Sequence, residues 1–175
     1  MTVYRRHTYC SFCGTVYPEG MAWPRRCPTC ANTTYVNPLP VAVTLLPVGG
    51  GLLLVRRSIP PKLGELALPG GFINAGESWQ HACARELAEE TGIATDPAQI
   101  RPLTVLSADD GMLLVFGVAP PLPGEALPTL APNDEVSELA ILSAPAELAF
   151  PLHTQAAALY FHQLREHGEV RPLEA

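Results

Sequence analysis

The sequence predicts a small zinc ribbon followed by a larger α/β domain in which strands and helices are mixed. Two Cys-x-x-Cys pairs stand near the start of the chain. Apolar runs broken by glycine turns follow them, and one such run leads into a helix that carries several carboxylates. With 175 residues, 47% of them hydrophobic, the chain is long enough for one ordinary domain with its own core and a small appendage.

The ribbon is predicted from Cys10, Cys13, Cys27 and Cys30, whose two pairs are separated by thirteen residues. This spacing is typical of a tetrahedral zinc site with four thiolate ligands. A disulfide network is the alternative, but it requires an oxidising compartment. We therefore expect structural Zn²⁺, which would supply the folding free energy of residues 1–37.

The charge of the ribbon leaves its role open. Its charged residues are Arg5, Arg6, Arg25 and Arg26 against Glu19 alone, whereas the whole chain has a net charge of -6. A basic segment could bind nucleic acid, form a homodimer contact or brace the larger domain. Because zinc ribbons often serve as scaffolds, we favour a structural role and expect no nucleic-acid partner.

The sequence gives no sign of a membrane protein. Its apolar runs are all shorter than a membrane span, and the first residues lack the apolar core of a signal peptide. The expectation is a cytoplasmic protein with no membrane partner.

Residues 38–175 are expected to form the main domain, after a short stiff linker that ends in a proline. Apolar runs at residues 41–46 and 52–57 flank a glycine turn and predict a hairpin. The remaining predicted elements are strands at 65–68, 100–106, 112–119 and 138–142, a proline-rich loop at 120–132, and helices at 145–150 and 154–167.

The most informative feature is a carboxylate cluster formed by Glu86, Glu89 and Glu90. At 3.6 residues per turn, Glu86 and Glu90 lie one turn apart with Glu89 beside them, so the three side chains point into one small volume. Like charges at this spacing destabilise a helix unless a cation lies between them, and Mg²⁺ or Mn²⁺ prefers such oxygen ligands. The alternative is a solvated acidic helix face.

The surroundings of the cluster favour the metal site. Residues 69–71 end an apolar strand, residues 76–78 form a turn that leads into the helix, and Gly92 ends it. A glycine loop allows a ligand to approach the backbone closely. Beside it, a metal held by several carboxylates would suit the oxygens of a diphosphate.

This stretch resembles the signature of the Nudix hydrolases. That signature is a glycine, five residues, Glu, seven residues, Arg-Glu-aliphatic, one residue, Glu-Glu, one residue and Gly-aliphatic. The resemblance implies an α/β/α sandwich with a mixed sheet, and an enzyme that hydrolyses a metal-bound diphosphate. All nine defined positions are matched, by Gly71, Glu77, Arg85, Glu86, Leu87, Glu89, Glu90, Gly92 and Ile93.

The resemblance also implies roles for these residues. Glu86 and Glu90 would hold the metal, and Glu89 would hold a further metal or orient water. The carbonyl of Gly71 could complete the metal shell. Arg85 and Glu77 resemble a pair that braces the site.

Two acids outside the signature are further candidates. Nudix relatives often place a catalytic or metal-binding acid in a loop near Glu135 and Glu138. Glu135 is preferred because Glu138 falls within a predicted strand, although both could be solvated loop acids. Leu66 stands where many Nudix sequences have a tryptophan.

A zinc ribbon joined to a Nudix domain resembles two groups, the NADH pyrophosphatases and the zinc-ribbon pyrophosphatases that act on FAD or ADP-ribose. The first group has a Ser-Gln-Pro-Trp-Pro-Phe-Pro string, which is absent where this chain reads LSADDGMLLVF. We therefore expect a pyrophosphohydrolase for a small nucleotide of the FAD, ADP-ribose or NAD(H) kind. The alternatives are an enzyme acting on capped or oxidised nucleotides, and a ligand sensor or nucleic-acid-binding regulator.

Overall fold

The computed structural model describes residues 7–122, 129–130, 133–171 and 173. The chain divides into two compact units, Met1–Pro38 and Leu39–Ala175. Arg5 and Arg6 of the predicted basic ribbon lie outside the described residues, as do residues 123–128 and 131–132 of the predicted proline-rich loop. No helix in the described part of the chain is long and apolar enough to cross a membrane.

The first unit is built from short turns and one small hairpin. Strands β1 (Arg25–Arg26) and β2 (Thr33–Thr34) pair antiparallel. Its buried cluster consists of Cys10, Tyr17 and Cys27. A core of this size supplies little hydrophobic stabilisation, as expected of a segment that a metal holds together.

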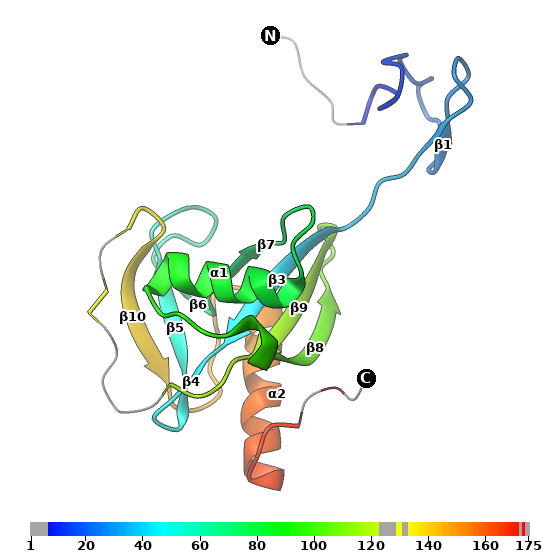
Figure 1. The fold of residues 1–175 in the computed structure, drawn as a ribbon. Coiled ribbons are helices and arrows are strands. Elements are labelled where there is room, and N and C mark those ends of the chain that lie inside the picture. The colour runs from blue at the N-terminus through cyan, green and yellow to red at the C-terminus, as the bar shows by residue number, and fades with distance from the viewer. Residues whose placement is uncertain (1–6, 123–128, 131–132, 172, 174–175) are drawn as a thin grey trace. The chain divides into compact units, whose positions relative to one another are not determined.

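The second unit contains two four-stranded sheets (Figure 1). One has the order β7-β3-β9-β8 and is mixed, because β3 and β9 run parallel. In the other, β5 pairs antiparallel with β10, β4 and β6. In chain order the elements are β3 (Leu39–Leu45), β4 (Pro47–Val48), β5 (Gly51–Arg57), β6 (Leu66–Ala67), β7 (Gly70–Phe72), α1 (Trp79–Thr91), the 3-10 turn η1 (Pro97–Gln99), β8 (Arg101–Ser107), β9 (Met112–Val118), β10 (Val136–Leu142) and α2 (Pro151–His167).

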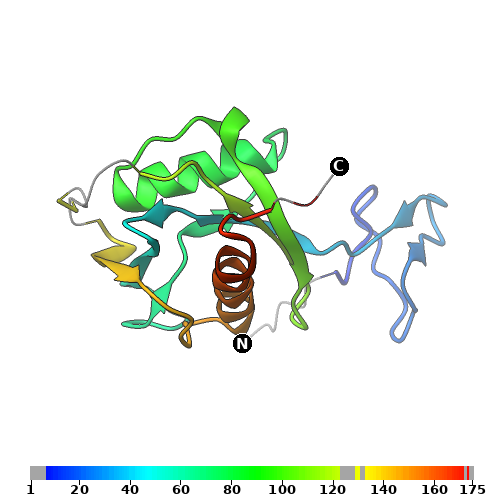
Figure 2. The ribbon, with the colours of Figure 1, turned by 90° about the horizontal axis from the view of Figure 1, so that it is seen from below.

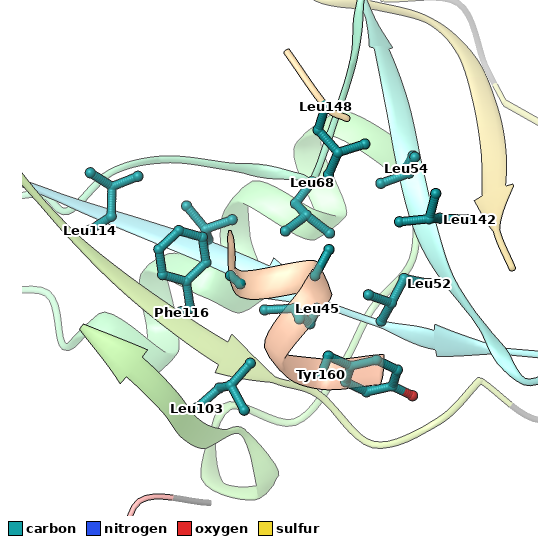
Figure 3. Packing of buried hydrophobic residues seen from close by; sticks show 13 residues of the cluster. Leu45, Leu52, Leu54, Leu68, Leu103, Leu114, Phe116, Leu142, Leu148 and Tyr160 are labelled. Carbon is teal, nitrogen blue, oxygen red and sulfur yellow. The ribbon is translucent and has the colours of Figure 1, made fainter. Parts of the chain in front are cut away.

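The two helices cover opposite faces of the strands. Alternate residues of a strand point to opposite faces. On β5, Leu52 and Leu54 join the buried cluster that includes Tyr160 of α2, whereas Leu53 joins the cluster that includes Leu87 of α1. Figure 2 looks along α2, with α1 beyond the strands, and Figure 3 shows the cluster around α2. The predicted α/β/α arrangement with a mixed sheet is confirmed.

The predicted hairpin between residues 41–46 and 52–57 is wrong. β3 pairs with β7 and β9 in the other sheet, and only the short β4 folds back on β5. Glycine turns and apolar runs are local signals, whereas the partner of a fully buried strand is decided by long-range packing.

The predicted helix at residues 145–150 is also wrong. This segment is irregular, because the amide of Ala149 donates to the carbonyl of Leu66 and the amide of Leu148 donates to the hydroxyl of Thr154. α2 then begins at Pro151, three residues before its predicted start, since proline suits the first turn of a helix.

Buried His153 on α2 links this helix to the strands. Its Nδ1 accepts a hydrogen bond of 3.3 Å from the amide of Leu68, and its ring packs against Phe116 and Phe150. Burial, with a smaller effect from the positive charge of Arg57, lowers the pKa of His153 from 6.5 to about 3. The imidazole is therefore neutral in the folded protein at neutral pH.

We expect His153 to make the protein sensitive to acid. In the unfolded chain this histidine is protonated below pH 6.5, whereas in the folded chain it is protonated only below about pH 3. Its contribution to the free energy of unfolding is therefore fully present above pH 6.5 and is lost as the pH falls from 6.5 towards 3. The free energy of unfolding should lose about 1.4 kcal/mol per pH unit from this residue. In denaturant titrations, His153→Asn, which keeps an acceptor for the Leu68 amide, should flatten this slope. Exposed His162→Asn is the control, and an unchanged slope in His153→Asn would contradict the assignment.

Candidate active site

Three segments far apart in the sequence line a pocket of about 620 Å³. They are the end of β5 with the loop that follows, β7 with α1, and the loop before β10. Carboxylates dominate its polar wall. The lining residues are Arg57, Ile59, Gly70, Gly71, Phe72, Asn74, Arg85, Glu86, Glu89, Glu90, Asn133, Asp134 and Glu135.

α1 positions the acids because its ends are fixed by local signals. The side chain of Ser78 accepts a hydrogen bond from the amide of His81 and caps the first turn. Gly92 adopts a φ of 75° and its amide donates to Ala88, which ends the helix. The helix predicted between the turn at residues 76–78 and Gly92 is confirmed.

Glu90 is the most buried acid of the pocket, with only 7% of its surface exposed. One of its carboxylate oxygens accepts a hydrogen bond of 3.0 Å from the amide of Gly70. Burial raises the pKa of Glu90 to about 8, and the nearby charges of Glu86 and Glu135 add to the rise. A cation in the pocket would favour the charged form of this acid.

Glu86 lies against the backbone of Gly71. A Cβ atom built on Gly71 would come within 2.5 Å of the carboxyl carbon of Glu86. Only glycine therefore allows this carboxylate to reach the floor of the pocket. Burial raises the pKa of Glu86, although Arg85 opposes the effect.

Arg85 bridges three carboxylates. Its Nε and Nη2 donate to the two oxygens of Glu77 at 2.9 and 3.0 Å, and its Nη1 donates to Glu86 at 2.6 Å and to Glu89 at 3.0 Å. The bonds to Arg85 lower the pKa of Glu77 to about 2. The positive group that separates the neighbouring acids in this structure is thus a guanidinium, which fixes Glu86 and Glu89 at one wall.

The acids surround the pocket and do not meet at one point. In the described part of the chain, the four cysteines are the only His, Cys, Asp or Glu side chains that form a group of three or more placed to hold a metal ion. The donors at the pocket are nevertheless carboxylate and backbone oxygens, the hard ligands that Mg²⁺ and Mn²⁺ prefer. The residues present therefore fit a hard divalent cation.

The two loop acids differ in position. Glu135 lines the pocket and lies close enough to raise the pKa of Glu90. Glu138 belongs to β10 and pairs with Arg56 on the neighbouring strand. The loop acid preferred from the sequence is thus the one at the pocket.

Five lining residues escaped the sequence reasoning, namely Ile59, Phe72, Asn74, Asn133 and Asp134. Asn133 and Ile59 lie in loops without regular pattern, and Phe72 follows the signature glycine at a position that the signature leaves free. Its exposed fraction of 54% is unusual for a phenylalanine and could have been inferred only from the strand pairing. Arg57 also lines the pocket and Arg56 does not, as the alternation of side chains along β5 requires of two neighbouring residues.

A family model described as NUDIX domain matches residues 37–164. The chain belongs to the NUDIX domain family. The resemblance inferred from the signature is thereby confirmed.

Relatives of known name agree with this membership of the Nudix family. The chain is 33% identical over 91 residues to an NAD-capped RNA hydrolase NudC of Shigella flexneri, an alignment that covers 51% of this chain and 35% of that protein. It therefore spans about a third of the length of this curated relative.

Solved structures show the same fold. A NUDIX hydrolase from Nitrosomonas europaea is 26% identical, with a TM-score of 0.69 and coverage of 93% of this chain and 94% of that chain. A MutT/nudix family protein from Enterococcus faecalis is 21% identical, with a TM-score of 0.64 and coverage of 76% of this chain and 64% of that chain.

The cysteine cluster lies in the first unit, ahead of the matched Nudix segment in the sequence. Its four sulfurs lie within 4.8 Å of one another, with Cys10 and Cys30 at 3.7 Å and Cys13 and Cys27 at 3.6 Å. A tetrahedral zinc with Zn–S bonds of about 2.3 Å places its sulfurs roughly 3.8 Å apart, whereas a disulfide bond measures about 2.05 Å. The cluster is therefore arranged to hold a metal ion.

We predict one equivalent of zinc per chain. The protein should be purified without added metal and its zinc content measured by elemental analysis. Cys27→Ser should lose the zinc and lower the melting temperature, because the metal supplies the folding free energy of this segment. Cys83→Ala, at a buried cysteine of α1, is the matched control and should keep it. A zinc-free protein with disulfides among the four cysteines would contradict the assignment.

Proposed function

We propose that this protein is a metal-dependent pyrophosphohydrolase. Its substrate would be a diphosphate that joins a nucleoside to another moiety, of the FAD, ADP-ribose or NAD(H) kind, and its products two phosphate-bearing halves. The observation that supports this most strongly is the full set of signature carboxylates, Glu86, Glu89 and Glu90, at a pocket that also contains Arg57. A protein that only senses a ligand has no need of all these acids.

Mg²⁺ or Mn²⁺ is the proposed cofactor. Glu86 and Glu90 would hold it, Glu89 would hold a further ion or orient water, and the carbonyl of Gly71 could complete the shell. When bound, such an ion polarises phosphoryl oxygens and lowers the pKa of a coordinated water. The burial of Glu90 supports this role, because a carboxylate with a pKa raised to about 8 gains from a neighbouring cation.

The other residues of the pocket would position the reactants. Arg85, itself fixed by both oxygens of Glu77, holds Glu86 and Glu89 through charged hydrogen bonds. The carboxylate of Glu135, on the loop before β10, is the group proposed to accept a proton from the attacking water or to orient that water. The guanidinium of Arg57 would bind phosphate oxygens from the β5 side.

The pocket wall also suits an aromatic base. Phe72 is 54% exposed directly beside the signature glycine, and a base stacked on such a ring gains about 1–3 kcal/mol. The curated relative is named for NAD-capped RNA, and NAD contains an adenosine joined through a diphosphate. This supports a dinucleotide or nucleotide-sugar substrate.

We propose that residues 1–37 form the zinc ribbon and residues 38–175 the Nudix domain, with zinc serving architecture and not catalysis. Soft thiolates that close a four-coordinate site leave no open position for a diphosphate. Cysteines stay reduced in the cytoplasm and are then available as zinc ligands, so the four-cysteine cluster is consistent with a cytoplasmic protein.

A substrate panel tests the proposed function. The full chain would be assayed with FAD, ADP-ribose, NADH, an NAD-capped RNA oligonucleotide and 8-oxo-dGTP, each with Mg²⁺ or Mn²⁺. We expect the highest kcat/KM on FAD, ADP-ribose or NADH. Faster cleavage of the capped RNA or of the oxidised nucleotide would show that the proposed substrate class is wrong. Tight binding of a compound without turnover of any of them would favour a ligand sensor.

A further inference from the structure

The side chain of Asn133 is bonded to two separate segments of the pocket. Its Nδ2 donates to the carbonyl oxygens of Glu89 and Glu90 at 3.4 and 3.2 Å. Its Oδ1 accepts from the amides of Glu135 and Val136 at 3.0 and 2.7 Å. One amide side chain thus joins the carboxylate helix to the loop that carries the remaining acid.

Each half of this connection binds backbone groups of a different segment. The last carbonyl groups of a helix receive no hydrogen bond from an amide of the same helix, and Glu89 and Glu90 lie in the final turn of α1. On the loop side, an asparagine that accepts from amides two and three residues ahead closes a tight turn. Both sets of bonds together require an acceptor and a donor on one short side chain, which the amide of asparagine supplies.

The loop is anchored beyond Asn133 as well. The carbonyl of Glu135 accepts a hydrogen bond of 2.7 Å from the amide of Ser58, just after Arg57. Val136 is buried and starts β10 opposite Arg57. The backbone of Glu135 is therefore held from the β5 side by these contacts, and from the α1 side by Asn133.

We propose that Asn133 is a positioning residue that sets the separation between Glu135 and the carboxylates of α1. The inference rests on the proposed function, because it gives Glu135 a part in the reaction. Glu135 is exposed, so its carboxylate owes its place to the backbone on which it stands. A displacement of about 1 Å in a reacting group can cost about 10²-fold in rate, and loss of a partner that orients a metal site costs about 10- to 100-fold.

Two variants sever the helix connection and keep the loop turn. Asn133→Ser and Asn133→Asp both retain an oxygen acceptor for the amides of Glu135 and Val136. Ionised aspartate offers no donor to α1, and the hydroxyl of serine stands on a side chain too short to replace Nδ2. We expect kcat on the best substrate of the panel to fall about 10- to 100-fold while KM changes by less than about 3-fold. Agreement between the neutral and the charged variant would show that added charge is not the cause.

Asp96→Ser is the matched control. The side chain of Asp96 closes a comparable turn by accepting from the amide of Ala98 at 2.9 Å, but it lies at η1 and outside the pocket. It should change thermal stability about as much as Asn133→Ser and leave kcat unchanged. Loss of folding in both Asn133 variants would assign Asn133 to stability alone and overturn the positioning role.

A double-mutant cycle decides whether Asn133 acts through Glu135. Glu135→Gln should itself lower kcat, and adding Asn133→Ser to it should lower kcat by less than about 3-fold more, since two residues that act as one unit are not additive. The inference would be overturned if the losses of kcat in the two single variants multiply in the double variant. It would also be overturned by wild-type kcat in Asn133→Ser or in Glu135→Gln. None of these results would contradict the proposed hydrolase activity. If the wild-type chain cleaves nothing, the proposed function itself fails.

Discussion

Replacing Glu90 or Glu86 by glutamine should lower the turnover of the best substrate by about 10²-fold or more. Glutamine has nearly the same shape but offers a weaker, neutral ligand, so the variants lose charge at the pocket and little packing. Glu90→Gln should also keep an acceptor oxygen for the amide of Gly70, which donates to a carboxylate oxygen of Glu90 in the wild type. Steady-state rates with Mg²⁺ and Mn²⁺, alongside thermal melts, measure both effects.

The control for these variants is Glu166→Gln, an exposed acid on α2 that pairs only with its neighbour Arg165 among the described residues. It should retain full activity. If Glu86→Gln and Glu90→Gln fold normally and turn over at the wild-type rate, the pocket does not use these acids and the proposed mechanism is wrong.

Gly71→Ala should reduce turnover by about 10²-fold without unfolding the protein. The added methyl group would lie 2.5 Å from the carboxyl carbon of Glu86, so the carboxylate must leave its place. Gly71 pairs with Ala42 in an ordinary antiparallel ladder and its φ is not in the left-handed region, so alanine suits its backbone. Kinetics and a thermal melt of the same preparation separate the two effects.

Gly111→Ala provides the opposite case. Gly111 has a φ of 87° and open space around its Cβ position, so alanine there should cost stability and leave turnover unchanged. Wild-type turnover in Gly71→Ala would show that the close approach of Glu86 to this glycine has no part in the reaction.

The features that the sequence predicted well depend on short stretches of chain. The ends of α1 follow from a serine cap and a terminal glycine, and the spacing of the carboxylates on it follows from the helix period. The cysteine cluster follows from the spacing of two pairs. Each signal lies within a few residues of the structure that it predicts.

The features that were missed depend on contacts between distant segments. β7, only three residues long, exists because Gly71 pairs with Ala42. The pair of Arg85 and Glu77 was expected, but the further bonds from Arg85 to Glu86 and Glu89 were not. The tie from Asn133 to α1 spans more than forty residues of sequence. Composition and periodicity contain no information on such pairings.

Product analysis in isotope-labelled water tests the central claim most directly. The full chain would be incubated with ADP-ribose, or the best substrate of the panel, in ¹⁸O water with Mg²⁺, then with a mild chelator, then with Mg²⁺ restored. We predict two phosphate-bearing products, one of which carries a single ¹⁸O, no reaction under the chelator, and full recovery with zinc retained throughout. Turnover that persists without the divalent ion, or release of inorganic phosphate in place of two phosphate-bearing halves, would contradict the account.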